Sequence, residues 1–158
     1  MRNKKGFTLI ELLVVIAIIG LLATIAVVAL NSARTSSRDA KRVADVRQVQ
    51  TGLEMYFNSQ TQYPYGAGCG TYASPVRLSA LATAACSPAL VPFVTGIGNI
   101  TDPVSSNTTP CDADTQSNNC DYGYAAPTAP YYVIYFSLEG TSGSFEAGPH
   151  TATSAGIL

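Results

Sequence analysis

The chain has 158 residues, a length that suits a single small domain. Its 9 Lys and Arg residues nearly balance its 10 Asp and Glu residues, and the formal net charge is −1. The cations cluster between Arg34 and Arg47, however, and only Arg77 follows Gln48. The later part of the chain is therefore acidic. This argues against a broad nucleic-acid-binding surface, which would be basic, and we expect no direct nucleic-acid binding there.

An apolar run from Phe7 to Leu30 dominates the beginning of the chain. A helix of about 24 residues is roughly 36 Å long, which is enough to span a bilayer. A secretory signal would have a shorter apolar core ending at a small-residue cleavage site, whereas this run continues into an amphipathic segment at Asn31. The sequence therefore predicts a transmembrane helix at residues 7–30 that stays in the mature protein.

The start of the apolar run carries a recognisable motif. Residues 5–12, KGFTLIEL, resemble the processing site of type IV pilins and type II secretion pseudopilins. The resemblance implies that a prepilin peptidase cuts between Gly6 and Phe7, releases the leader peptide 1–6 and methylates the new amino group of Phe7. It also implies a cytoplasmic leader. The positive charges alone do not establish this orientation, because more cations follow the run than precede it.

Glu11 is the one charged residue inside the apolar run. A charge at the centre of a membrane helix costs on the order of 2.5–3.5 kcal/mol, so an acid there is normally paired or protonated. The resemblance implies that cleavage creates a free amino group on Phe7. The Phe7 amine of a neighbouring subunit is the expected partner of Glu11 when helices stack in a filament. The alternative is an acid that is tolerated near the membrane interface.

The helix is expected to continue as an amphipathic segment at residues 31–63. Apolar residues recur there every three or four positions, and Pro64 ends the pattern because a proline disfavours the helical conformation of the preceding residue. Many pilins carry a proline in the second half of the membrane segment. This chain lacks it, so we predict an essentially continuous helix from Phe7 to about Asn58, with any weakness confined near Gly20. The predicted apolar stripe consists of Val43, Val46, Val49 or Gln50, Leu53, and Tyr56 or Phe57.

Two pairs of opposite charges on this segment have helical spacing, Asp39 with Arg42 and Lys41 with Asp45. Such pairs contribute only about 0.2–0.5 kcal/mol on an exposed helix. We interpret them as part of a solvated face.

Residues 64–158 are predicted to form a small globular part, called the head from here on. Ser74 and Pro75 have the character of a helix N-cap and first turn, and they predict a short helix through about Ala84.

Further along the head, apolar alternation predicts three short strands, at residues 122–125, 131–138 and 144–147. The tail at residues 148–158 carries no strong structural signal. We predict an α+β, pilin-like fold in which the long N-terminal helix packs against a small antiparallel sheet. The face expected to cover the helix stripe consists of Tyr132, Ile134, Phe136 and Leu138.

All 4 cysteines, Cys69, Cys86, Cys111 and Cys120, lie in the head. An even number in an exported part fits two disulfides formed in an oxidising compartment. Three connectivities are possible. Pairing Cys69 with Cys86 and Cys111 with Cys120 is favoured because it closes short loops in segments rich in Gly, Ser, Asn and Pro. A zinc site is disfavoured because there is no Cys-x-x-Cys pair and no nearby histidine.

The second cysteine loop region also contains oxygen donors, Asp112, Asp114, Asn118 and Asp121. Calcium binds such groups, and related pseudopilins carry calcium in a head loop. The spacing nevertheless lacks the central glycine and terminal glutamate of a standard calcium loop. A solvated acidic loop is the favoured interpretation, and no cofactor is expected.

The sequence offers little for catalysis. His150 is the one histidine, and no serine has the surroundings of a nucleophile elbow. We therefore expect a surface histidine and no enzymatic activity.

The resemblance implies a structural subunit of a type IV pilus-like filament that self-assembles through Phe7, Glu11 and the N-terminal helix. One alternative is a major or minor pseudopilin of a type II secretion or competence (DNA uptake) system. Another, of a different class, is a membrane-tethered extracytoplasmic binding module. The implied partners are identical or related pilin subunits, the prepilin peptidase, the inner-membrane assembly platform and the membrane. The chain would be a single-pass inner-membrane protein first and part of an extracellular pilus or periplasmic pseudopilus later.

Overall fold

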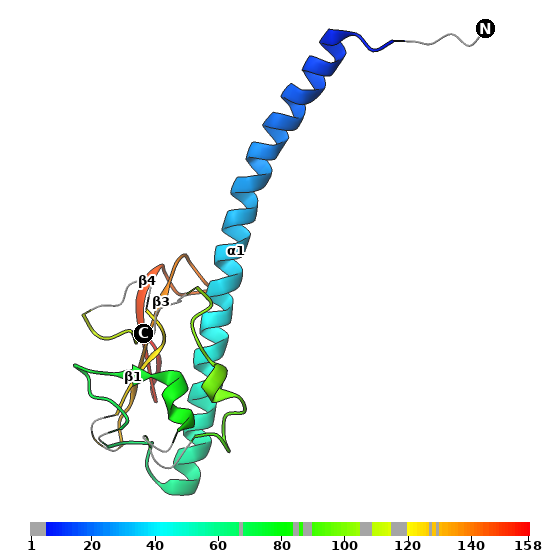
Figure 1. Ribbon diagram of the computed structural model, residues 1–158. Coiled ribbons are helices and arrows are strands. Elements are labelled where there is room, and N and C mark those ends of the chain that lie inside the picture. The colour runs from blue at the N-terminus through cyan, green and yellow to red at the C-terminus, as the bar shows by residue number, and fades with distance from the viewer. Residues whose placement is uncertain are drawn as a thin grey trace. The chain divides into compact units, whose positions relative to one another are not determined.

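A computed structural model describes residues 6–66, 68–83, 86, 90–104, 109–114, 120–126, 128 and 130–158. The chain divides into two compact units, Met1–Thr35 and Ser36–Leu158. The helix α1, Leu9–Gln60, contributes residues to both units and has no break at Gly20 (Figure 1). Its ends lie within about two residues of the predicted ones, which is the usual spread for helix termini.

In the first unit, α1 is apolar on all sides. The large apolar side chains from Phe7 to Leu30 are exposed, including Leu9 at 80% and Val28 at 71%. By length and composition the helix can cross a membrane. Such a helix is stable only in apolar surroundings, so this part of the chain fits a membrane anchor.

In the second unit, one side of α1 is covered by the head. The predicted apolar stripe is buried, with Gln50 and Phe57 only partly so. The fully or almost fully buried members are Val43, Val46, Val49, Leu53 and Tyr56.

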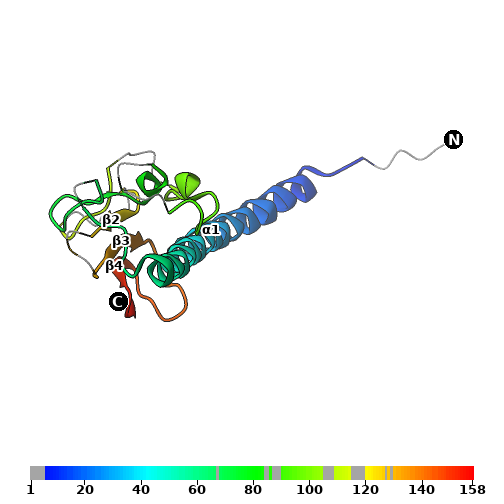
Figure 2. The same ribbon diagram turned by 90° about the horizontal axis from the view of Figure 1, so that it is seen from below.

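The head contains one five-stranded antiparallel sheet with the strand order β1-β2-β3-β4-β5. Figure 2 shows β2, β3 and β4 side by side. Two short 3-10 helices, η1 (Leu78–Ala82) and η2 (Ile97–Asn99), precede β2. The strands are β1 (Val76–Arg77), β2 (Gly123–Ala125), β3 (Val133–Leu138), β4 (Gly148–Thr153) and β5 (Gly156–Ile157).

The predicted inner face of the central strand is confirmed. Tyr132, Ile134, Phe136 and Leu138 are all buried, at 2% exposure or less, and they share one hydrophobic cluster with the stripe of α1. Because alternate residues of a strand point to the same side, this face covers the helix along the full length of β3.

The helix predicted at residues 74–84 is wrong. Val76 belongs to β1 and pairs with Tyr124 of β2, and only the five residues Leu78–Ala82 form a helical turn, η1. Thr71 and Ser74 exchange two main-chain hydrogen bonds, at 3.0 and 3.1 Å. Ser74 therefore closes a tight turn and does not cap a helix. Pairing with β2 overrides the weak local helix signal.

The last predicted strand is also wrong in position. In residues 144–147 only Phe145 is paired, by an isolated bridge to Ser142, and β4 begins at Gly148, in the tail that carries no strong structural signal in the sequence. In β4 only Ala152 is buried. The strand is held by main-chain hydrogen bonds to β3, so its side chains show no apolar alternation that the sequence could reveal.

Candidate functional site

The start of α1 is closed by a reciprocal contact between Thr8 and Glu11. The main-chain N–H and the hydroxyl of Thr8 both donate to Oε2 of Glu11, at 2.8 and 2.6 Å, and the N–H of Glu11 donates to Oγ1 of Thr8 at 3.3 Å. This is a capping box, which satisfies N–H groups that a helix leaves free at its start. Among the residues that the structure describes, none donates to the other carboxylate oxygen, Oε1.

Gly6 and Phe7, the predicted cleavage residues, lie directly before this capping box. Both are exposed, Phe7 at 83%. A Cβ atom at Gly6 would meet nothing within 4 Å, so the packing of this chain does not itself require glycine. The sequence argument recognised Glu11 but missed Thr8. The signal was present, since Thr-x-x-Glu before an apolar run is the pattern of a capping box.

A second cluster of charges lies in the other unit, on α1. Asp39 and Arg42 are completely buried, which contradicts the solvated face expected for them. Nη1 of Arg42 donates to Oδ1 of Asp39 at 2.6 Å and to Oε1 of Glu139 at 2.7 Å, and its Nε donates to Oδ2 of Asp102 at 2.6 Å. Arg38 adds a two-pronged contact to Glu139. Lys41, in contrast, is exposed as predicted.

The cluster fastens two head segments to α1. Asp39 also accepts the main-chain N–H groups of Glu139 and Gly140, at 3.0 and 2.7 Å, so the loop after β3 is held by its backbone as well as by a side chain. Partners that lie 60 and 97 residues from Arg42 leave no local pattern, which is why sequence spacing suggested only an exposed pair.

The electrostatics of the cluster favour its charged form. Burial opposes the charge on Arg42, but hydrogen bonds to three carboxylates outweigh burial and raise its pKa. The hydrogen bond from Arg38 lowers the pKa of Glu139 to about 2, and Arg42 adds to that effect. An arginine completely removed from water is tolerable because it donates four hydrogen bonds to carboxylates. The arrangement can hold the head in place, because each of its three carboxylates accepts a hydrogen bond from Arg42.

Cys69 is bonded to Cys86 and Cys111 to Cys120, the pairing of neighbours that the loop argument favoured. Among the described residues no cysteine is free.

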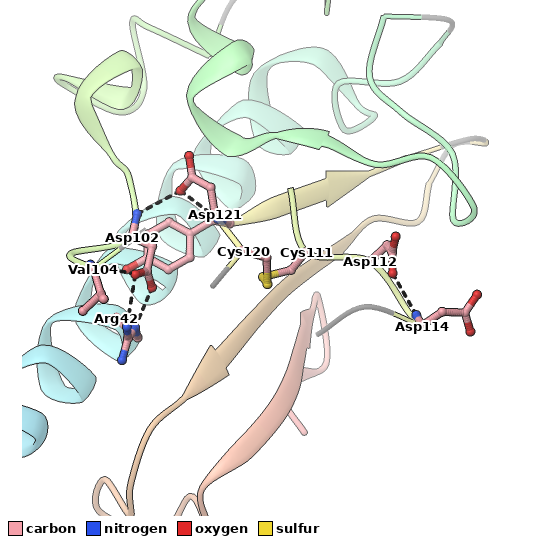
Figure 3. Close-up of a disulfide and its surroundings, with 9 residues drawn as sticks. Arg42, Asp102, Val104, Cys111, Asp112, Asp114, Cys120 and Asp121 are labelled. Carbon is pink, nitrogen blue, oxygen red and sulfur yellow. Dashed lines mark hydrogen bonds and ion pairs between the residues drawn. A yellow bond between two sulfur atoms is a disulfide. The ribbon is translucent and has the colours of Figure 1, made fainter. Parts of the chain in front are cut away.

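The acidic residues around the second disulfide do not come together. Figure 3 shows Asp121 and Asp102 on one side of this disulfide and Asp112 and Asp114 on the other. Asp114 is exposed, and its N–H donates to Oδ1 of Asp112 at 2.9 Å. Asp121 is only 3% exposed, so the expectation of a solvated loop is wrong for it. Asn118 lies outside the described residues.

Asp121 has a structural place instead. Its Oδ1 accepts the N–H groups of Asp102 and Tyr122, both at 2.8 Å, and burial raises its pKa. These contacts link the segment before β2 to the loop that carries Asp102. Groups of three or more metal-binding side chains are absent from the described part of the chain.

His150 contacts main-chain oxygens of its neighbours, Glu146 at 2.8 Å from Nε2 and Leu158 at 3.1 Å from Nδ1. Its ring stacks on Phe136 and meets Phe145 edge-on. These contacts give the histidine a place in the packing of β4, half-buried and not fully on the surface.

Comparisons with known proteins point to the N-terminal segment. Residues 1–27 match the family model described as the prokaryotic N-terminal methylation motif. Over 63 residues, 40% of this chain, the sequence is 36% identical to type II secretion system core protein G of Dickeya chrysanthemi and of Aeromonas hydrophila. These matches span 41% and 44% of the two relatives, so the chain covers less than half of their length. No solved structure matches.

The long apolar-to-amphipathic helix and the antiparallel head define a pilin-like protein. The methylation motif and the two relatives agree with that class. Together they support a relationship to the type IV pilins and type II secretion pseudopilins.

Proposed function

We propose that this chain is a structural, non-enzymatic subunit of a type IV pilus-like filament, cut by a prepilin peptidase between Gly6 and Phe7 and self-assembling through its N-terminal helix. The observation that carries the proposal is the segment from Gly6 to Glu11, which joins an exposed cleavage step to an acid at the start of an apolar helix. Its partners would be identical or related subunits, the prepilin peptidase and the inner-membrane assembly platform.

The capping box suggests how Glu11 is accommodated before assembly. Thr8 occupies Oε2 of the carboxylate, so the acid is not left without hydrogen bonds in a single subunit. Oε1 remains available, and the amine that cleavage creates on Phe7 of a neighbouring subunit would pair with it. An ion pair away from water is strong when both charges are hydrogen-bonded, so this contact would select one axial stagger of the helices.

Replacing Glu11 tests this assembly role. Glu11→Val should leave membrane residence and the head unchanged, because it removes only a costly charge from an apolar helix, and filaments should be lost. Glu11→Gln is the matched control, because it retains the capping contact to Thr8 but not the charge. Abundant, ordered filaments from Glu11→Val would contradict the amine partnership.

Cleavage is tested separately by mass spectrometry of the membrane-bound protein. The mature chain should begin at a methylated Phe7, and a bulky residue at Gly6 should leave the precursor uncut. Since Gly6 has open space around it, such a substitution should not disturb the fold. A loss of cleavage would then reflect poorer recognition by the peptidase. A major species that still contains residues 1–6 would contradict processing.

A pseudopilin of a type II secretion system is the second candidate. The observation that favours it is that both relatives are named as core proteins of such a system. Electron microscopy of material sheared from the cell surface distinguishes the two, because a pilus is extracellular and a pseudopilus is periplasmic. A membrane-tethered binding module would form no filaments in either place.

A further inference from the structure

A polar pocket of about 380 Å³ lies in the second unit between α1 and the turn that joins β4 to β5. We call it the hairpin pocket. The helix contributes Arg47, Gln50, Thr51 and Glu54, Tyr132 lies beside them, and the turn contributes Thr153, Ser154, Ala155 and Gly156. None of these residues belongs to the buried charge cluster described above.

The hydroxyl of Tyr132 is an unexplained feature of this pocket. The side chain is 2% exposed, and its oxygen is covered and forms no hydrogen bond with any described residue. Burial raises the pKa of Tyr132, and a side-chain contact with Gln50 opposes that rise. The geometry of this contact does not make a hydrogen bond, and Nε2 of Gln50 donates to the main-chain oxygen of Thr153 at 2.8 Å. Burying a hydroxyl without a hydrogen-bond partner costs free energy of folding, so a tyrosine at this position needs an explanation.

Other buried tyrosines of the same core are satisfied within the subunit. The hydroxyl of Tyr124 donates to the main-chain oxygen of Pro64 at 2.8 Å, and that of Tyr63 donates to Oε1 of Glu54, also at 2.8 Å. The orphan hydroxyl of Tyr132 is therefore not a general property of this aromatic cluster. It coincides with the hairpin pocket.

The remaining polar groups of the pocket include two exposed hydrogen-bond donors. Arg47 is exposed and forms no ion pair with the described residues, and Ser154 is an exposed hydroxyl. Glu54 is two helical turns away from Arg47, about 10.5 Å along the axis, and already accepts from Tyr63. A guanidinium with hydroxyls beside it is suited to a carboxylate, which can accept from several donors at once.

We propose that the hairpin pocket is a contact between copies of this chain, in which Arg47 and the Tyr132 hydroxyl bind an exposed carboxylate from the head of a second copy. The hydroxyl is covered in the single subunit, so this contact requires a side chain of the pocket to turn aside. The head supplies such partners, because it is acidic and its described part exposes Asp114 and Glu146. The inference rests on the proposed function, since a filament brings heads of identical subunits together.

The first test separates stability from assembly with two tyrosine variants of the full chain in detergent. Tyr132→Phe removes an unsatisfied group, so the denaturant midpoint should stay the same or rise, while self-association falls about tenfold, equivalent to about 1.4 kcal/mol. Tyr124→Phe is the matched control: it breaks a bond inside the subunit, so its midpoint should fall. If Tyr132→Phe instead loses stability as Tyr124→Phe does, or associates normally, the proposal is overturned.

The second test addresses the carboxylate. Arg47→Glu should abolish association, whereas Lys41→Glu, an exposed cation on the same helix outside the pocket, should change it by less than about threefold. Two double variants combine Arg47→Glu with either Asp114→Arg or Glu146→Arg, and one of these double variants should recover association. Failure of both combinations overturns the assignment of a second copy's carboxylate. If the unsubstituted chain does not associate at all, the filament function itself fails, and this is distinguishable from a defect seen only in the variants.

Discussion

The two units of this protein use one helix in opposite ways. Up to Thr35, α1 exposes its large apolar side chains and satisfies its single acid, Glu11, with a neighbour three residues away. Beyond Ser36, the same helix buries both charges of the pair Asp39 and Arg42. The comparison shows that the polarity of a helical residue does not decide its burial. What surrounds the helix decides it, and in the second unit loops distant in sequence supply the partners.

The largest effect should come from removing the buried cation. Arg42→Met leaves several carboxylates near one another without their arginine, and breaking such a buried network costs about 3–5 kcal/mol. Unfolding of the full chain in detergent with guanidinium would measure the loss. Lys41→Met, next to it but exposed, should stay within about 0.5 kcal/mol. An Arg42→Met protein as stable as its parent would show that the cluster merely fills space.

The second prediction concerns the disulfides, which lie in the second unit and are absent from the described part of the first. Cys111→Ser with Cys120→Ser removes the shorter of the two disulfide loops and should destabilise the head by about 2–4 kcal/mol. Circular dichroism during unfolding should then show an early loss of head structure while the helical signal of the apolar segment persists. Simultaneous loss of both signals would mean that the two units unfold as one.

Replacing one glycine of α1 in each unit by alanine compares how tightly the helix is packed in the two units. A Cβ atom at Gly52 would lie 2.0 Å from Cγ2 of Val94, so Gly52→Ala forces a shift in the core and should cost about 1–3 kcal/mol. Gly20→Ala meets nothing within 4 Å and should only gain up to about 1 kcal/mol of helix propensity. Thermal unfolding of the two variants checks the pair. Equal effects would contradict the difference in environment.

The last prediction is a pH dependence of stability in the second unit. Because Arg38 lowers the pKa of Glu139 to about 2 in the fold, against about 4.3 when unfolded, the ionised form stabilises the protein fully above about pH 4.3 and loses that contribution as the pH falls toward 2. Burial raises the pKa values of Asp45 and Asp121, which act in the opposite sense.

The comparison with Glu139→Gln isolates this one carboxylate. The difference in unfolding free energy between the parent and the variant should shrink between about pH 4.3 and pH 2. A difference that stays constant over that interval would show that the ion pair with Arg38 contributes nothing that depends on the charge of Glu139.

Local patterns were enough for the helix and for its apolar partner on the sheet. The spacing of Val46, Val49 and Leu53 predicted the buried stripe, and alternation along β3 predicted the face that covers it. Patterns failed where main-chain pairing or distant contacts dominate. Val76 looked helical but pairs with β2, and the polar β4 exists because β3 offers its free edge.

By itself, the sequence determined the apolar helix, the methylation motif around Gly6 and the acid at Glu11, because each depends on residues within a few positions of one another. The hairpin pocket and the burial of Arg42 were decided only by the tertiary structure. Arg42 meets Asp102 and Glu139 across 60 and 97 residues, and Tyr132 shares a hydrophobic cluster with the stripe of α1. Contacts of that range carry no periodicity along the chain, so they become visible only when the fold brings their partners together.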